Sequence, residues 1–137
     1  MRHAIKRMSP VDVLAAVVSR VTGGTGTQCL TDPDDEESPF YFAEIVSSRP
    51  GRSKTMRVDV FDVAVHAIST PSDTREGVLG MVASLEEAME RDVDVPAPFW
   101  LVGQDDLGIQ TIKRDPSQEW HAVVGFELSV SYGLVVK

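Results

Sequence analysis

The sequence predicts an α+β fold in which two α-helices pack on one face of an antiparallel or mixed β-sheet that ends in a long C-terminal strand. Three observations support this prediction. Two segments carry apolar residues at helical spacing, several segments have the composition of strands, and residues 120–132 alternate between apolar and polar side chains. The chain has 137 residues, of which 42% are hydrophobic, which is enough for one core. We therefore expect residues 1–137 to form a single domain without internal repeats.

The first helix is expected to begin at Ser9-Pro10, because Ser is a good N-cap and Pro is favoured at the first helical position. Apolar residues then follow on one helical face: Leu14, Val17, Val18 and Val21. Gly23-Gly24 is expected to end this helix. The polar segment 22–39 that follows is interpreted as a long mobile loop.

Residues 40–68 predict an antiparallel hairpin of two strands joined by a mobile, turn-rich tip at 47–55. In the second strand the apolar residues change face part-way along. Either the strand is buried on both sides, or a β-bulge near Val60-Phe61 resets the register. We expect the bulge, because Arg57 and Asp59 have the character of solvent-facing residues.

Thr70-Pro71-Ser72-Asp73 predicts the start of the second helix by the same capping logic, and the helix should end near Asp92. Gly77 and Gly80 weaken this helix, so we expect them to mark a close approach to the sheet or to a neighbour. Short strands are expected at 99–102 and 109–113, on either side of "GQDDLG".

The last strand is the strongest prediction in the chain. Its thirteen alternating residues, 120–132, would span about 43 Å, more than twice the length of a typical strand. A small core does not require a strand of that length.

No motif for catalysis, a cofactor or a metal is found. The three histidines, His3, His66 and His121, lack the spacing of a zinc site, and structural or surface roles are favoured for the last two over catalysis or ligand contact. "GGTGT" at 23–27 follows a helix and lacks the Gly-Lys ending of a phosphate loop, so a flexible loop is the better interpretation. We expect no enzymatic activity, no cofactor and no metal.

The cysteine content and the lack of long apolar runs indicate the compartment in which the protein is found. Cys29 is the only cysteine, which indicates a reducing compartment. No apolar run reaches the ~18 residues of a membrane span, and the N-terminus lacks a signal peptide. A soluble cytoplasmic protein without a membrane partner is expected.

An acidic run stands out in a chain whose net charge is −8: Asp32, Asp34, Asp35, Glu36 and Glu37. It lacks the turn glycine and the distal glutamate of a calcium loop. A solvated loop whose charges repel one another is the favoured interpretation. Two alternatives stay open: weak binding of a divalent cation, and a charged surface that has a functional role. The negative net charge argues against binding of nucleic acid through its phosphate groups.

Four cations lie close together in and beside the hairpin tip: Arg49, Arg52, Lys54 and Arg57. They are either solvated or in contact with an acidic patch on another copy of the chain. Such a head-to-tail contact is heterologous, and it closes into a ring if the rotation permits. We therefore list the acidic run and these four cations as candidate subunit-interface or lumen residues.

Across residues 10–133 the order of elements resembles the tail terminator (tail completion) proteins of long-tailed bacteriophages. The likeness lies in the first helix and in four later segments: "SPFYFAEIV", "MRVDVFDVAVHAIS", "SDTREGVLGMVASLEEAME" and "EWHAVVGFELSVSYGL". This resemblance implies a non-enzymatic virion protein, assembled in the host cytoplasm, that caps the tail tube as a hexameric ring. Its partners would be copies of itself, the tail tube protein and a head–tail connector or neck protein.

The same resemblance implies that DNA passes through the lumen of the ring without specific binding. Negative walls would repel its phosphates, which fits the acidic composition. The alternative is a non-enzymatic acidic binding or assembly module, such as another neck or connector protein or a nucleic-acid mimic. A small enzyme that uses His66 or His121 is the less favoured third possibility.

Overall fold

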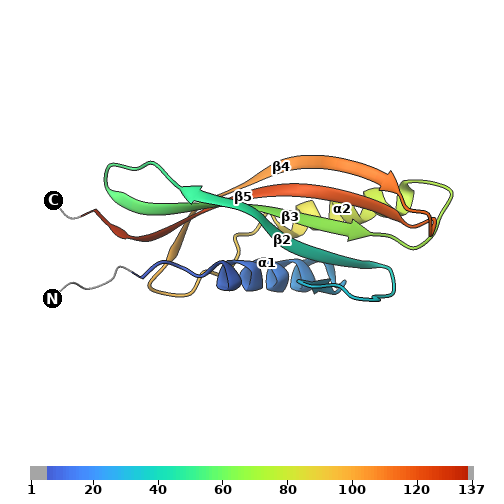
Figure 1. Cartoon of the computed structure of the whole chain (residues 1–137), viewed down its shortest axis with the longest axis horizontal. Coiled ribbons are helices and arrows are strands. Elements are labelled where there is room, and N and C mark those ends of the chain that lie inside the picture. Colours follow the sequence, from blue (N-terminus) through green and yellow to red (C-terminus); the bar gives the residue numbers. More distant parts are fainter. Residues whose placement is uncertain (1–5, 136–137) are drawn as a thin grey trace.

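A computed structural model describes residues 6–135, which form two helices and five strands in an elongated α+β arrangement (Figure 1). The elements are, in chain order, α1 (Pro10–Thr25), β1 (Cys29–Leu30), β2 (Phe40–Pro50), β3 (Met56–Ile68), α2 (Glu76–Ala88), β4 (Trp100–Arg114) and β5 (Trp120–Leu134). Both helices lie on the same face of the sheet. The predicted fold class is confirmed.

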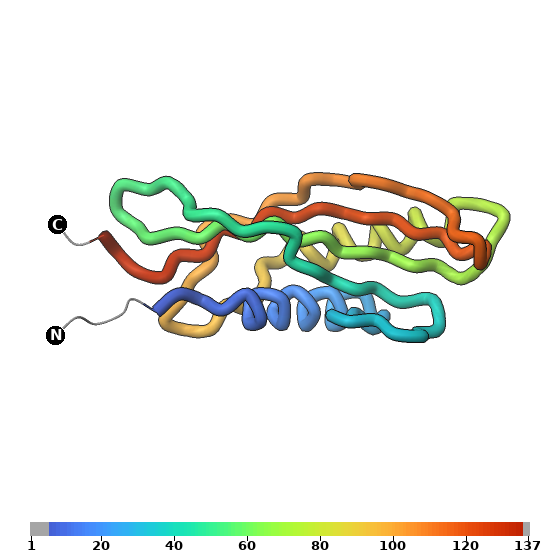
Figure 2. The backbone as a smooth tube through the Cα atoms, in the orientation of Figure 1, coloured from blue at the N-terminus to red at the C-terminus, as the bar shows by residue number. Residues whose placement is uncertain are grey.

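The five strands form one mixed sheet in the order β1-β2-β3-β5-β4. The short β1 is parallel to β2 and covers only Tyr41 and Phe42, and the other neighbours are antiparallel. Four long strands run side by side along the molecule, as the tube in Figure 2 shows. One edge of the sheet is therefore β4, and beyond Phe42 the other edge is β2.

The core lies between the helices and the sheet. On β5 the even-numbered residues 120–130 are all buried, in agreement with the alternation predicted for this strand. Tyr41 on β2 is 1% exposed, and its hydroxyl donates a hydrogen bond of 2.7 Å to the carbonyl of Met81 on α2. The sheet and α2 are thus joined by a polar contact as well as by apolar packing.

The start of α1 is confirmed and its end is not. The Ser9 hydroxyl accepts a hydrogen bond from the Val11 backbone N–H, as an N-cap should. The helix continues through Gly23 and Gly24 to Thr25, so the expected stop was wrong. Gly26, in the left-handed conformation at φ 77°, supplies the C-cap. The polar connection therefore begins at 26, and its mobility stays a prediction.

The bulge expected at Val60-Phe61 is also wrong, because β3 is buried on both faces. Its pairing with β2 and β5 is continuous there, and the register shifts lie at Ile45/Ser47 and at Arg57/Val58. Asp59, expected to face solvent, is 7% exposed. On the other face Val58 and Val60 are buried, and Gly51 across the hairpin lies close to them, since a Cβ on Gly51 would lie 2.8 Å from Val58 Cγ1.

Helix α2 begins at Glu76 and not near Thr70. The backbone of Ser72 is bonded elsewhere: its N–H donates to the carbonyl of Gln118, and its carbonyl accepts from the Trp120 indole. These contacts hold the segment before α2 as a connection. The helix ends at Ala88, before Asp92. A Cβ on Gly80 would meet nothing within 4 Å, so the expected close approach is not at this residue.

The segment around "GQDDLG" is not a loop between two short strands. It lies inside the single strand β4, which pairs with β5 along its length with register shifts at Leu101/Gly103, Asp106/Gly108 and Ile109/Thr111. Interruptions of this kind bend an edge strand and make it a poor template for further pairing. The hairpin tip is likewise shorter than predicted, because 47–50 belong to β2.

Candidate interaction surfaces

The acidic run and the basic tip lie at opposite ends of the molecule. The acidic run precedes β2 and the tip follows it, and the 11 residues of this strand span roughly 35 Å. Figure 1 shows the connection before β2 at one end of the long axis and the hairpin tip at the other. All five carboxylates of the run, Asp32, Asp34, Asp35, Glu36 and Glu37, are exposed. The two charged segments cannot meet within one chain.

The four predicted cations have different surroundings. Arg49 on β2 forms ion pairs with Asp62, at 2.7 Å, and with Glu127, at 3.0 Å. Arg52 and Lys54 are exposed at the tip, and Arg57 is half-buried at the start of β3. Among the ion pairs between described residues, none involves these last three. At least Arg52 and Lys54 are therefore free to meet a partner.

The sheet face that the helices leave open carries a row of acids that the sequence analysis missed. Asp62 on β3 is paired in register with Glu127 on β5, which is paired with Asp105 on β4. Like charges directly opposite one another on neighbouring strands are destabilising. The Arg49 guanidinium lies against the first two and offsets part of this repulsion, while Asp105 is exposed.

Beside this row the open face has a groove. Ala64 on β3 pairs with Gly125 on β5, and Gly125 pairs with Gly108 on β4. These three neighbouring positions therefore carry no large side chain. The groove has a volume of about 320 Å³ and a mainly apolar lining. Its walls include Val46, Leu107 and Val123 on the apolar side, and Glu44, Asp62, His66 and Gln110 on the polar side. Sequence alone could not place these residues together, because they come from four strands.

His66, which belongs to the groove lining, forms a pair with His121. His66 Nδ1 lies 2.7 Å from His121 Nε2, so the two rings share a hydrogen bond. Phe42 stacks on His66 with ring centroids 4.0 Å apart, and Glu44 Oε2 lies 3.6 Å from His66 Nε2. Burial and then His121 lower the pKa of His66, and burial also lowers the pKa of His121. Both rings are therefore neutral at pH 7.

We expect the histidine pair to make the fold less stable in mild acid. A folded-state pKa below the unfolded value means that the unfolded chain binds more protons, so stability is present above pH ~6.5 and falls as pH falls below it. Glu44 and Asp115 oppose this effect by favouring the imidazolium forms, and Lys113 adds to it. Thermal unfolding of the wild type should therefore shift to lower temperature between pH 7.5 and 5.5.

The control for this prediction is the double variant His66→Gln/His121→Gln, followed by circular dichroism over the same pH range. The side-chain hydrogen bond with Asp106, followed by burial, raises the pKa of Glu86 to about 7, which acts with the opposite sign, since stability from this group is lost as pH rises. Because Glu86 is present in both proteins, only the difference between them reports the histidines. An equal shift in both proteins would contradict the prediction.

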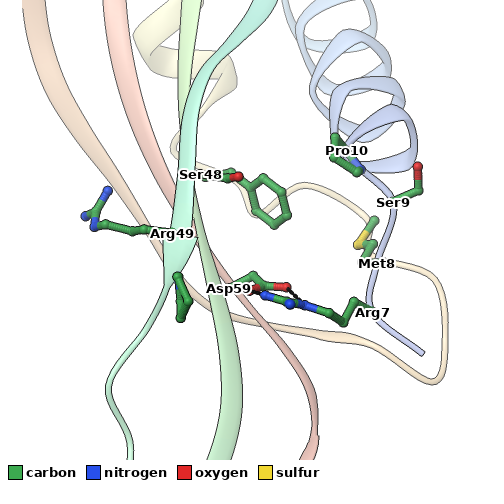
Figure 3. Close-up of a pocket in the computed structure, with 9 residues that line it drawn as sticks. Arg7, Met8, Ser9, Pro10, Ser48, Arg49 and Asp59 are labelled. Carbon is green, nitrogen blue, oxygen red and sulfur yellow. Dashed lines mark hydrogen bonds and ion pairs between the residues drawn. The ribbon is translucent and has the colours of Figure 1, made fainter. Parts of the chain in front are cut away.

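A second cavity of about 430 Å³ lies between the segment before α1 and the end of β2 (Figure 3). Arg7 forms a bidentate ion pair with Asp59 there, with Nε 2.8 Å from Oδ2, and its guanidinium lies 5.1 Å from the centroid of the Tyr132 ring. Arg49 points away from this cavity. The ion pair explains how Asp59 is buried, and it ties the segment before α1 to the sheet.

The described residues contain neither a cluster of metal ligands nor a helix that could span a membrane. Within 6–135, no group of three or more His, Cys, Asp or Glu side chains is arranged so that it could hold a metal ion. Neither α1 nor α2 is long and apolar enough to cross a membrane. Cys29 is buried, and burial raises the pKa of its thiol to about 12.

Comparison with known proteins agrees with the element order described above. The profile of a phage tail terminator family, described as "Putative tail termination protein", matches residues 4–137. The chain belongs to this family. It is thus a structural protein of a phage tail, and the resemblance noted in the sequence is confirmed.

A solved structure has a fold similar to that of this tail protein. A chain from the "Virion of native gene transfer agent (GTA) particle" is similar with a TM-score of 0.69 and 17% sequence identity. The similarity covers 87% of this chain and 94% of the other. No curated protein matches the sequence.

Proposed function

We propose that this chain ends polymerisation of a phage tail tube by capping it as a ring of six copies, and that the ring forms the tail side of the head–tail joint. Membership of the tail termination family across residues 4–137 is the observation that carries the proposal. The partners are then other copies of the chain, the tube protein and a connector or neck protein. The role is structural and not enzymatic, and its place is in the virion after assembly in the host cytoplasm.

The charge distribution supports a ring. A basic tip at one end of the molecule and acidic surfaces elsewhere make a heterologous contact possible, in which each copy presents its tip to the next. Complementary charges favour the correct neighbour and speed its encounter. Each copy also carries a net charge of −8, so a lumen lined by such copies would repel DNA phosphates and let the DNA pass.

The direct test uses purified protein and polymerising tube protein. Wild-type chain should stop tubes at a limited length and appear as six-copy rings, free or on tube ends, by native mass spectrometry and negative-stain microscopy. A chain that stays monomeric and leaves tube growth unchanged would overturn the proposal.

Reversing one tip charge should weaken the ring. Lys54→Glu is expected to raise the dissociation constant between copies by about tenfold at low salt, because a like charge then faces the acidic surface of the neighbour. The effect should shrink at high salt, where the Debye length is only about 3 Å at 1 M. Sedimentation velocity at both salt concentrations measures it.

Arg91→Glu is the matched control for Lys54→Glu. It makes the same change in net charge at another exposed side chain, far from the tip in sequence, just after α2. If both variants weakened the ring equally, the cause would be overall charge, and the tip would have no specific role.

A further inference from the structure

The ring proposal leaves open which acidic surface receives the basic tip. Two acidic surfaces are candidates: the acidic run 32–37 and the open face of the sheet around Glu44, Asp62, Asp105 and Glu127. We propose that the hairpin tip 51–55 of one copy binds in the groove on the open face of the sheet of the next copy. This inference rests on the proposed ring and specifies its interface.

The groove combines the two features that a Lys or Arg side chain needs. Its floor is made by Ala64 and Gly125, and apolar walls rise from Val46 and Leu107, so the methylene stem of a long cation can be covered there. Val46 is 63% exposed and Leu107 is 50% exposed, which leaves apolar surface for a partner to bury.

The groove also has an excess of negative charge. Glu44 and Asp62 belong to its lining, and Glu127 and Asp105 lie beside it in register with Asp62. Two cations act on this region: Arg49 pairs with Asp62 and Glu127, and Lys113 acts on His66. Arg49 shows that a guanidinium fits against this row. Glu44 has a half-exposed side chain and its neighbour His66 is neutral at pH 7, so this carboxylate is available to a further cation.

The tip has the matching properties. Arg52 and Lys54 are exposed on either side of Ser53, and the tip has a fixed base because the Gly51 N–H donates a 2.8 Å hydrogen bond to the Val58 carbonyl. The acidic run is the weaker receiver. Its carboxylates are all exposed, and ion pairs between fully exposed groups contribute little to binding.

The contact cannot form within one chain. Pro50 lies six positions after Glu44 on β2, a distance of roughly 20 Å along the strand. The tip of a copy therefore lies out of reach of its own groove. Each copy offers one tip and one groove, and contacts of this heterologous kind repeat from copy to copy until the ring closes.

Cysteine cross-linking between copies tests this arrangement. Glu44→Cys and Lys54→Cys proteins are mixed and treated with a short bis-maleimide. We expect a cross-linked dimer from the mixture and none from either variant alone. Cys29 is 4% exposed with a pKa raised to about 12, so it should not react, and wild-type protein checks this.

Asp34→Cys mixed with Lys54→Cys is the matched control for the second acidic surface. Preferential cross-linking of this pair would overturn the proposal in favour of the acidic run. Cross-links from Glu44→Cys only to added tube protein would overturn it too, because the groove would then serve another partner. If rings form and cap tubes while no groove cross-link appears, the interface is wrong but the proposed function stands.

A charge swap gives an independent readout. Glu44→Lys and Lys54→Glu should each weaken association by about tenfold, and the chain that carries both should recover most of the loss, since the pair is restored with reversed sign. Additive weakening in the double variant would contradict a direct contact. Circular dichroism of each variant shows whether the fold is kept.

Discussion

Replacing Phe126 by alanine should lower the free energy of unfolding by about 3–5 kcal/mol, the cost of emptying a fully buried aromatic site. Phe126 is 1% exposed and lies on the helix-facing side of β5, between its paired neighbours Val63 on β3 and Asp106 on β4. Domains of this size are stable by only about 5–15 kcal/mol. The variant should therefore be close to unfolding at 37 °C, and urea titration followed by fluorescence or circular dichroism measures the change.

Ser129→Ala is the matched control on the opposite face of the same strand. Ser129 is half-buried on the side that no helix of the described chain covers, so its truncation should change the free energy of unfolding by less than about 0.5 kcal/mol. Equal losses at the two positions would mean that β5 does not divide its residues between a core and an open face.

The fold class and the longest strand followed from local patterns. A strand turns its side chains to opposite faces with a period of two, so the alternation of 120–132 predicted β5 and the even-numbered residues that it buries as far as Val130. Beyond Val130 the pattern fails, because Ser131 is buried and Tyr132 is only partly buried. The start of α1 followed from a side-chain cap that depends on neighbouring residues alone. Features with short-range causes were therefore predictable from the sequence.

The errors on β3 have long-range causes. On the second face of the strand Val58 and Val60 are buried, and Gly51, across the hairpin, lies close to both side chains. The residue pattern of β3 alone does not reveal this neighbour. Asp59 is buried because Arg7, 52 residues away, forms its ion pair. Asp59 and Asp62 are both acids within β3, and the sequence of the strand did not show which of them would be buried.

The candidate site was predictable in its charges and not in its geometry. The acidic run and the basic tip are visible as clusters in the sequence, but the groove exists only because Ala64, Gly125 and Gly108 come into register on three strands. His66 and His121 meet for the same reason. Register depends on bulges such as the one at Ile45/Ser47, and these had no local signature.

The Gly-Gly pair in α1 gives a second large effect with an internal control. Gly24→Ala should lower the free energy of unfolding by about 1–3 kcal/mol, because the added methyl has no room. A Cβ on Gly24 would lie 2.5 Å from Ala88 Cβ and 3.1 Å from Ala88 Cα, so α1 and α2 would have to move apart. Thermal and urea unfolding measure the loss.

Gly23→Ala makes the same chemical change one residue earlier and should have the opposite sign. A Cβ on Gly23 would meet nothing within 4 Å, so alanine should stabilise the helix by about 0.5–1 kcal/mol through its higher helix propensity. The two glycines, taken together, predicted a helix end, yet only Gly26 ends the helix. If both substitutions stabilised the protein, the inferred close contact of α1 with α2 at Gly24 would be contradicted. Urea unfolding of each variant decides between the two outcomes.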